Sequence, residues 1–158
     1  MKWSLELGRV LGWLVGDGWL CEGKNCRVGF TFSQEDRPVL NLMKPYINQL
    51  YGKEVKEILR KNGVFHLSYH SPKFVRFFCQ LGMKPVTASK KNIPEALYCA
   101  PREAVVGFLQ GLFTADGTVS YDKKKNNRYV RLTSKSEELL KSTQLLLLNL
   151  GIKSKIFG

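Results

Sequence analysis

The chain has 158 residues, of which 44% are hydrophobic and 24% are charged. This length suits one domain or two small, closely joined halves, and the hydrophobic share is large enough for a buried core. No apolar run approaches the roughly 20 residues that a membrane-spanning helix needs, and the first residues lack the order of a signal peptide. The sequence therefore predicts a cytoplasmic protein with no membrane segment.

The chain is strongly basic. It has 25 Lys and Arg residues against 13 Asp and Glu residues, which gives a formal net charge of +12. Such an excess favours a polyanionic partner, and nucleic acid is the commonest one in cells. The four cysteines are expected to be reduced. A zinc site at Cys21 and Cys26 is an alternative, but the absence of a matching second pair favours small half-buried side chains.

The first half of the chain alternates helical and strand patterns. Val28, Phe30 and Phe32 alternate with polar residues, so one face of their strand should be core and the other open. Asn62-Gly63 between two apolar runs predicts a hairpin turn. The expected helices are 5–16 with Ser4 as its N-cap, 37–51 and 72–81; the expected strands are 19–22, 27–33, 55–60 and 64–70.

A connection precedes a second series of elements. We expect it to dock on the core through Ile93, Leu97 and Tyr98. In the later strand, Val130 and Leu132 are expected to face inward. The expected elements are helix 102–115, strands 118–121 and 128–134, helix 137–150 behind the cap Ser136 with a buried run at 145–148, and a last strand from Lys153.

Two stretches repeat within the chain, VLGWLVGDG at 10–18 and LQGLFTADG at 109–117. Each is an apolar helical run that ends in Asp-Gly, and each carries small residues four positions apart. Glycine inside a helix costs about 1 kcal/mol relative to alanine, so the repeated glycines indicate close packing of two helices. The stripes consist of Gly8, Gly12 and Gly16 in the first helix and of Gly107, Gly111 and Ala115 in the second.

These stripes place Asp17 and Asp116 at the ends of the two packed helices. The order helix, strand, strand, helix also recurs after both stretches, which indicates an internal duplication. We predict an α+β fold made of a pseudo-twofold repeat of αββαββα units, of which the second is incomplete. The hydrolysis of a phosphodiester needs an activated water and stabilised negative charge, and oxygen ligands that hold Mg²⁺ supply both. Because a helix C-terminus adds about half a negative charge, two such ends should attract a dication.

The two stretches resemble the paired motifs of the LAGLIDADG (dodecapeptide) homing endonucleases. The second stretch is close to the motif, whereas the first is looser at its start. The sequence KNIP at 91–94 is similar to a further block of intein-borne members. The resemblance covers nearly the whole chain and divides it into a first repeat at 1–82, a connection with the lysine block at 83–101 and an incomplete second repeat at 102–158.

The resemblance implies a DNA-binding saddle of two antiparallel sheets around two central motif helices. Members cut both strands of double-stranded DNA with a divalent cation, usually Mg²⁺. Asp17 and Asp116 would be the catalytic metal ligands, helped by the backbone carbonyls of Gly16 and Ala115. Lys91 would polarise the water or stabilise the transition state. Lys90 is adjacent, but the KNIP match favours Lys91.

Outward strand positions are the candidates for DNA contacts. Arg reads guanine edges, and Ser and Thr adapt to several bases. A basic turn is expected to grip phosphates. His66 and His70 could also be metal ligands, but they lack a neighbouring Cys or carboxylate. The DNA-binding candidates are Arg27, Thr31, Ser33, Arg60, Lys61, His66, His70, Tyr129, Arg131 and Thr133, with Lys123, Lys124 and Lys125 in the turn.

The leading hypothesis is a site-specific double-stranded DNA endonuclease, of intein type, that depends on a divalent cation. The alternative is a cleavage-deficient DNA-binding module, regulator or RNA maturase of the same fold. A second lysine equivalent to Lys91 is not expected within the chain. We expect a monomer with internal pseudo-symmetry, and self-association that completes the second repeat is the alternative.

Overall fold

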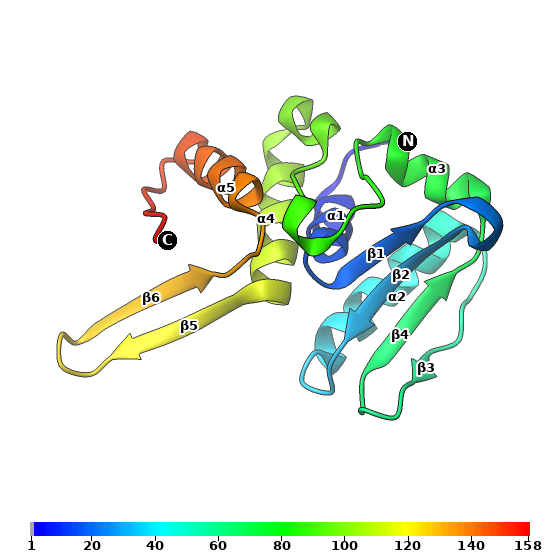
Figure 1. The fold of residues 1–158 in the computed structure, drawn as a ribbon, viewed down its shortest axis with the longest axis horizontal. Helices are drawn as coiled ribbons and strands as arrows, with labels where there is room; N and C mark the ends of the chain where they lie inside the picture. The colour runs from blue at the N-terminus through cyan, green and yellow to red at the C-terminus, as the bar shows by residue number, and fades with distance from the viewer. Residues whose placement is uncertain (1) are drawn as a thin grey trace.

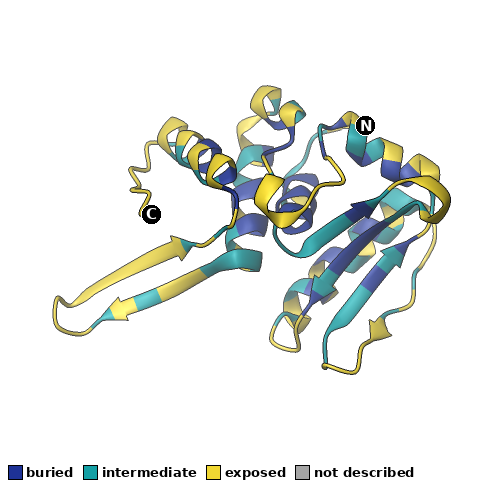
Figure 2. Cartoon of the chain, viewed as in Figure 1, coloured by how far each residue is buried: buried dark blue, intermediate teal, exposed yellow. Residues whose placement is uncertain are grey.

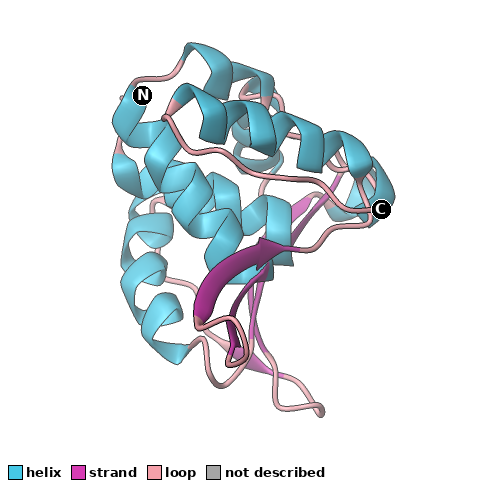
Figure 3. Ribbon diagram, turned by 90° about the vertical axis from the view of Figure 1, so that its left-hand side faces the viewer, coloured by secondary structure: helices cyan, strands magenta, loops and turns pink. Residues whose placement is uncertain are grey.

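Two groups of strands flank a central pair of helices. The computed structural model describes residues 2–158. In Figure 1, α1 (Leu5–Asp17) and α4 (Arg102–Asp116) lie side by side at the centre, with a larger sheet on one side and a strand pair on the other. Figure 3 shows the helices gathered on one side of the molecule and the strands on the other. The predicted α+β class with two antiparallel sheets is confirmed.

The first half forms a four-stranded antiparallel sheet in the order β1-β2-β4-β3. Val28, Phe30 and Phe32 are fully buried on its inner face, as their alternation predicted. Trp13 of α1 donates a hydrogen bond from Nε1 to the carbonyl of Thr31 over 3.0 Å, which joins the central helix to this sheet. The elements are β1 (Gly18–Cys21), β2 (Arg27–Phe32), α2 (Arg37–Tyr51), β3 (Ile58–Leu59), β4 (Phe65–Tyr69) and α3 (Pro72–Gln80).

The second half is smaller in the described chain. Its two antiparallel strands form a hairpin that projects from the end of α4 (Figure 1). The connection before α4 winds through short 3₁₀ turns, and its Ile93 and Leu97 are buried in the core. The elements are β5 (Gly117–Asp122), β6 (Asn127–Leu132) and α5 (Glu137–Asn149).

The two central helices pack backbone against backbone. A Cβ added at any of four glycines would overlap a backbone carbonyl of the facing helix: Gly8, Gly12, Gly107 and Gly111. Near the helix ends, the methyl of Ala115 lies 2.6 Å from where a Cβ on Gly16 would stand. At the exposed rim, Arg9 Nε donates to Gln110 Oε1 over 2.9 Å. The small residues therefore set the distance between the halves.

Serine caps start three helices in the way that the sequence indicates. The hydroxyl oxygens of Ser4, Ser71 and Ser136 each accept a hydrogen bond from a backbone N–H in the first turn of α1, α3 and α5. Gly52 and Gly82 follow α2 and α3 with φ of +91° and +94°, as expected for glycines that end a helix.

Gly18 and Gly117 end the motif helices differently. Both are extended, with φ of −122° and −87°, and each starts a strand at once. A Cβ on Gly18 would lie 2.7 Å from Leu14 Cα, and one on Gly117 would lie 3.1 Å from Phe113 Cα. Glycine is needed here because the chain turns tightly against the last helical turn.

The inward direction expected for Val130 is also wrong. Its side chain is 62% exposed, its cross-strand partner Val119 is 77% exposed, and Leu132 is half-buried. Figure 2 shows the contrast between the exposed hairpin and the buried strands of the first sheet. The alternation predicted the strand correctly, but within residues 2–158 nothing packs on the face of the hairpin that carries Val119 and Val130.

Two apolar sites are more exposed than expected. Tyr98 is 48% exposed beside the buried Leu97, because neighbouring residues of a 3₁₀ turn point about 120° apart. The run 145–148 is not a buried face as a whole: Leu146 is buried, whereas Leu145 and Leu148 are exposed. Four consecutive residues point in all directions around a helix, so one packed face buries only part of such a run.

Two predicted strands differ from the structure. The strand expected at 55–60 is limited to Ile58–Leu59, since Glu57 is bound by Arg37 and Lys44 of α2. The strand expected from Lys153 does not form: residues 152–158 are irregular, and no neighbouring strand of the described chain is there to share its hydrogen bonds. Across residues 2–158, no helix is both long and apolar enough to pass through a membrane.

Candidate functional site

Two half-buried carboxylates lie where the motif helices end. Asp17 and Asp116 are the last residues of α1 and α4. The carboxylate Oδ2 of Asp116 lies 3.4 Å from where a Cβ on Gly16 would stand, so the two helix ends meet directly. The stripes of small residues permit this approach, and they bring together two carboxylates that are 99 positions apart in the sequence.

Lys91 is hydrogen-bonded to the backbone at the end of α1. Its ammonium Nζ donates to the carbonyl of Gly16 over 2.8 Å and to the carbonyl of Gly18 over 3.3 Å. Lys90, the neighbouring candidate, is exposed. Spacing alone hardly separated these two lysines, whereas the fold directs only the Lys91 side chain to the helix ends.

The pKa values of all three groups are shifted from their usual range. Burial raises the pKa of Asp17 to about 6, with a further contribution from the negative charges of Asp116 and Asp36. Burial also raises the pKa of Asp116, although Lys91 opposes this shift. The pKa of Lys91 is lowered by burial in spite of the two carboxylates. A group of this kind gains stability when a cation approaches the carboxylates.

An open cavity of about 200 Å³ lies beside this group. Asp116, Lys91 and the segment between β6 and α5 form its wall. The full lining is Gly16, Ala88, Lys91, Asp116, Thr133, Ser134, Lys135 and Leu139. Thr133, a predicted DNA contact, is therefore at the site. A smaller hollow of about 100 Å³, which Lys91 also lines, is formed by apolar and polar residues of α1, β1 and the connection.

The oxygen atoms at this site can be compared with the ligands that a divalent cation prefers. Among residues 2–158, no group of three or more His, Cys, Asp or Glu side chains is placed to hold a metal ion. Two carboxylates and the carbonyls at the helix ends are present. Mg²⁺ in proteins is commonly bound by one or two carboxylates, with waters and phosphate oxygens as its other ligands, so the residues fit this cation.

Ser136 is a site residue that the sequence did not indicate. It was expected only to cap α5, and it does accept a hydrogen bond from Leu139 N. Its hydroxyl also donates to the backbone carbonyl of Lys91 over 2.6 Å. Thus α5 of the second half holds the backbone of Lys91, while α1 of the first half holds its side chain. No local pattern could show a bond that joins residues 45 positions apart.

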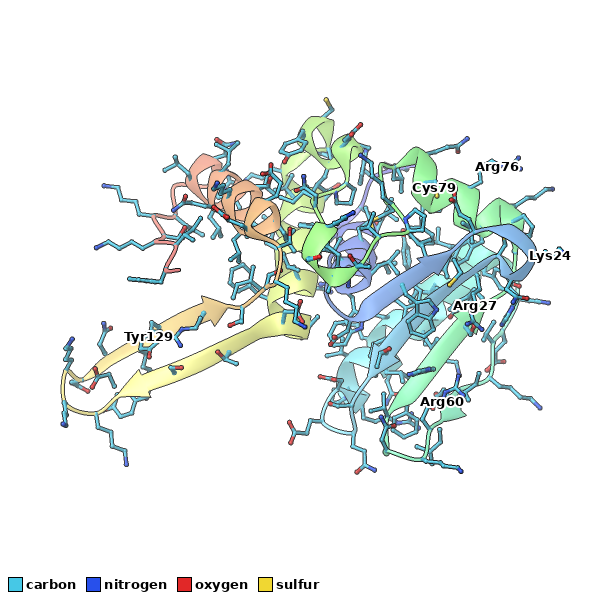
Figure 4. The ribbon with its side chains drawn as sticks, in the orientation of Figure 1. Lys24, Arg27, Arg60, Arg76, Cys79 and Tyr129 are labelled. Atoms are coloured by element: carbon cyan, nitrogen blue, oxygen red, sulfur yellow. The ribbon has the colours of Figure 1, made fainter. Side chains whose placement is uncertain are left out.

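The predicted DNA contacts fall into two separate groups. Figure 4 places Arg27 and Arg60 on the first sheet and Tyr129 on the hairpin at the opposite side of the molecule. Of the candidates, Arg27, Thr31 and His66 are half-buried and the others are exposed: Ser33, Arg60, Lys61, His70, Lys123, Lys124, Lys125, Tyr129, Arg131 and Thr133.

Local contacts restrict some of these candidates. Both the backbone N–H and the hydroxyl of Ser33 donate to Asp36 Oδ2, over 2.8 Å and 2.6 Å, so this hydroxyl already has a partner. His70 follows β4, and its Nε2 lies 3.1 Å from Ser68 Oγ. On the hairpin, Tyr129 and Arg131 lie opposite Ser120 and Thr118, so this face is polar as predicted.

The last third of the chain matches a family model. Residues 103–158 match the family described as LAGLIDADG-like domain. This part of the chain is therefore a LAGLIDADG-like domain. The whole chain is similar to the DNA polymerase of Thermococcus hydrothermalis, with 34% identity over 98% of the chain, but it spans only 9% of that protein.

Solved structures have the same fold as this chain. The homing endonuclease I-DmoI in complex with DNA and Mn matches 97% of the chain and 81% of its own chain, with a TM-score of 0.65 and 22% identity. The N-terminal LAGLIDADG domain of WhiA matches 98% of the chain and 69% of its own, with a TM-score of 0.59 and 16% identity. The architecture around the motif helices is therefore that of the LAGLIDADG fold.

Proposed function

We propose that the chain is a site-specific endonuclease that cleaves double-stranded DNA with the help of a divalent cation. The observation that carries this proposal is the convergence of Asp17, Asp116 and Lys91 at the helix ends. A structural role alone does not explain why two carboxylates and an ammonium are half-buried beside an open cavity. The fold match to I-DmoI, whose structures include target DNA nicked in one strand, supports the same function.

The residues divide the chemistry between them. Asp17 and Asp116 would hold the cation, with help from the carbonyls of Gly16 and Ala115. The cation, when bound, supplies Lewis-acid activation of water and neutralises charge that develops on the phosphate. I-DmoI has been solved with DNA and Mn and with DNA and Ca, which supports a divalent cation, and Mg²⁺ is the ion that we propose.

Lys91 would act on the phosphate. An ammonium has three protons, and two of them bond the carbonyls of Gly16 and Gly18. The third is then available to a phosphate oxygen in the cavity. Because its stem is fixed at both ends, the ammonium needs little reorganisation when negative charge develops there. Ser136, which holds the Lys91 backbone, would be a positioning residue.

The first sheet and the β5–β6 hairpin, which we call the two arms, would hold DNA on either side of this centre. The open face of the first sheet would read one half-site and the polar face of the hairpin the other, while Lys123, Lys124 and Lys125 bind phosphates. We propose that residues 1–82 and 102–158 act as two repeats of one monomer, joined by 83–101. The alignment with a small part of a DNA polymerase supports an intein-type origin.

A selection of bound duplexes from random DNA, followed by cleavage in Mg²⁺, tests the proposal. We expect Asp116→Asn and Lys91→Met each to reduce the cleavage rate by about 100-fold or more. Lys90→Met is the matched control, because it removes a neighbouring exposed lysine and should leave cleavage unchanged. EDTA should abolish cleavage by the unaltered chain.

Three outcomes would contradict the proposal. Cleavage that survives Asp116→Asn would overturn the site assignment. Binding with no nicking in Mg²⁺ or Mn²⁺ would favour the cleavage-deficient DNA-binding module. Affinity that does not change with salt would contradict phosphate contacts by the basic arms, since the release of counterions makes DNA binding steeply dependent on salt.

A further inference from the structure

Trp19 crosses the open face of the first sheet. It belongs to β1, and its register partner on β2 is Gly29. A Cβ on Gly29 would overlap the indole ring, so the ring occupies the space above this glycine. Beyond β2, the indole reaches His66 of β4, with 5.0 Å between ring centroids and an interplanar angle of 59°. A side chain of the outer strand thus contacts one that lies two strands away.

Arg60 approaches the same histidine from the hairpin turn. Its Nε lies 3.2 Å from His66 Nδ1 in hydrogen-bond geometry. A guanidinium can only donate, so Nδ1 must be the acceptor and the proton of the neutral ring must lie on Nε2. Burial and the charge of Arg60 both lower the pKa of His66, which keeps the ring neutral.

We propose that Trp19 and Arg60 hold His66 as a fixed hydrogen-bond donor that reads one base in the major groove. This inference rests on the proposed function, because the open face must lie on DNA for the reading to occur. His66 would be the residue that determines specificity at this position. Trp19 and Arg60 would be positioning residues, of which Arg60 sets the tautomer and Trp19 limits rotation of the ring.

The donor has a definite chemical preference. In the major groove, guanine presents O6 and N7, adenine presents N7 and thymine presents O4, all of which accept a hydrogen bond. Cytosine presents its N4 amino group, which donates. Two donors that face each other leave both unpaired, and this disfavours the wrong base more than a good contact favours the right one. We therefore expect cytosine to be excluded at the position that His66 reads.

The tautomer is testable without DNA. In long-range ¹H–¹⁵N NMR spectra, His66 of the unaltered chain should show a protonated Nε2 and an unprotonated Nδ1. Arg60→Met should replace this pattern by averaged shifts of two tautomers. Lys61→Met is the matched control, because it removes the next cation along the turn and should leave the His66 signals unchanged. A protonated Nδ1 in the unaltered chain would overturn the proposal.

The reading role is testable by selection from randomised duplexes. His66→Ala should reduce discrimination against cytosine at one position by about fivefold, with other positions unchanged. Arg60→Met and Trp19→Phe should weaken the same position, whereas Lys61→Met should lower affinity for all sequences alike. His66→Gln should not restore the exclusion of cytosine, since its amide oxygen can accept a hydrogen bond from the N4 amino group.

The outcomes separate this inference from the proposed function. An unchanged base profile in His66→Ala, with DNA still bound, would overturn the reading role alone. Equal effects of Arg60→Met and Lys61→Met on affinity, with no change of preference, would overturn the role of Arg60. If no duplex is selected, the proposed function fails and the reading role fails with it, while the NMR spectrum still decides the tautomer.

Discussion

The two halves of the chain use one sequence pattern to different extents. β2 and β6 both alternate apolar and polar residues and both follow a motif helix. In β2, Phe30 is fully buried beneath helices and is flanked by strands on both sides. In β6, Val130 is largely exposed, and β5 is its neighbour in the described chain.

The difference shows that alternation determines a strand and its two faces, but not whether either face is buried. Burial of a face depends on partners elsewhere in the chain, such as α1 and α3, which contact β2 of the first sheet. The first half should therefore hold most of the stability of the described chain, and the hairpin should depend on its attachment to α4. Four experiments test this comparison, in order of decreasing expected effect.

Phe30→Ala and Val130→Ala are the most direct pair. Removal of the buried ring should lower the free energy of unfolding by about 3–5 kcal/mol, because a cavity remains in a packed core. Val130→Ala should change it by less than about 0.5 kcal/mol, as for an exposed site. Urea unfolding followed by circular dichroism measures both. Equal losses in the two variants would mean that the hairpin face is covered after all.

Gly12→Ala tests the joint between the halves. The added methyl would overlap the carbonyl of Phe108 in α4, and neither backbone can move without separating the helices. We expect a loss of about 2–3 kcal/mol and faster hydrogen exchange in both β2 and β5. Thr114→Ala, at an exposed position of α4, is the control with a small expected effect. Faster hydrogen exchange in only one of the two sheets would contradict a helix interface that supports both halves.

Ser136→Ala removes a bond between the halves. The variant lacks both the N-cap of α5 and the donor to the Lys91 carbonyl, so unfolding should become easier by about 1–2 kcal/mol. Ser71→Ala, which removes a comparable cap from α3, controls for the loss of capping alone. Cleavage should slow in Ser136→Ala at temperatures where both variants remain folded. Equal cleavage rates would limit Ser136 to a capping role.

Asp17→Asn tests how the two helix ends differ. The pKa of Asp17 rises from 3.8 to about 6 on folding, so between these values the folded state binds more protons than the unfolded state. The contribution of Asp17 to stability therefore falls as the pH rises through this range. Without divalent cations, Asp17→Asn should raise the free energy of unfolding at pH 7 by about 1 kcal/mol, a value reduced for solvent screening of a half-exposed group.

The gain should disappear at low pH, where the carboxyl is protonated in both states. Asp116→Asn should give a smaller gain: Lys91 opposes both shifts, but the charges of Asp116 and Asp36 add to burial in raising the pKa of Asp17, whereas burial alone raises that of Asp116. The second half has Ser136 where the first half has Asp36, each directly before its helix. Thermal unfolding in EDTA across this pH range measures both variants. A gain that persists at low pH would contradict a titrating Asp17.

Local sequence patterns predicted most of the elements and their order, although the strand expected at 55–60 is shorter and the one expected from Lys153 does not form. Helix caps, the Asn62-Gly63 turn and the period of the apolar residues depend on neighbours a few positions away, so local patterns are enough to predict them. The small-residue stripes also identified the central packing, because glycine repeated inside helices has few other uses. For the same reason, the sequence was sufficient to pair Asp17 with Asp116.

The tertiary structure decided which side chains meet. It placed Lys91, and not Lys90, on the carbonyl of Gly16, and it brought Ser136 to the backbone of Lys91. These two hydrogen bonds join residues 75 and 45 positions apart. The fold also laid Trp19 across a whole strand onto His66. Such contacts depend on side-chain directions that no local pattern encodes, and the burial of a face, as Val130 shows, likewise depends on what the rest of the chain places over it.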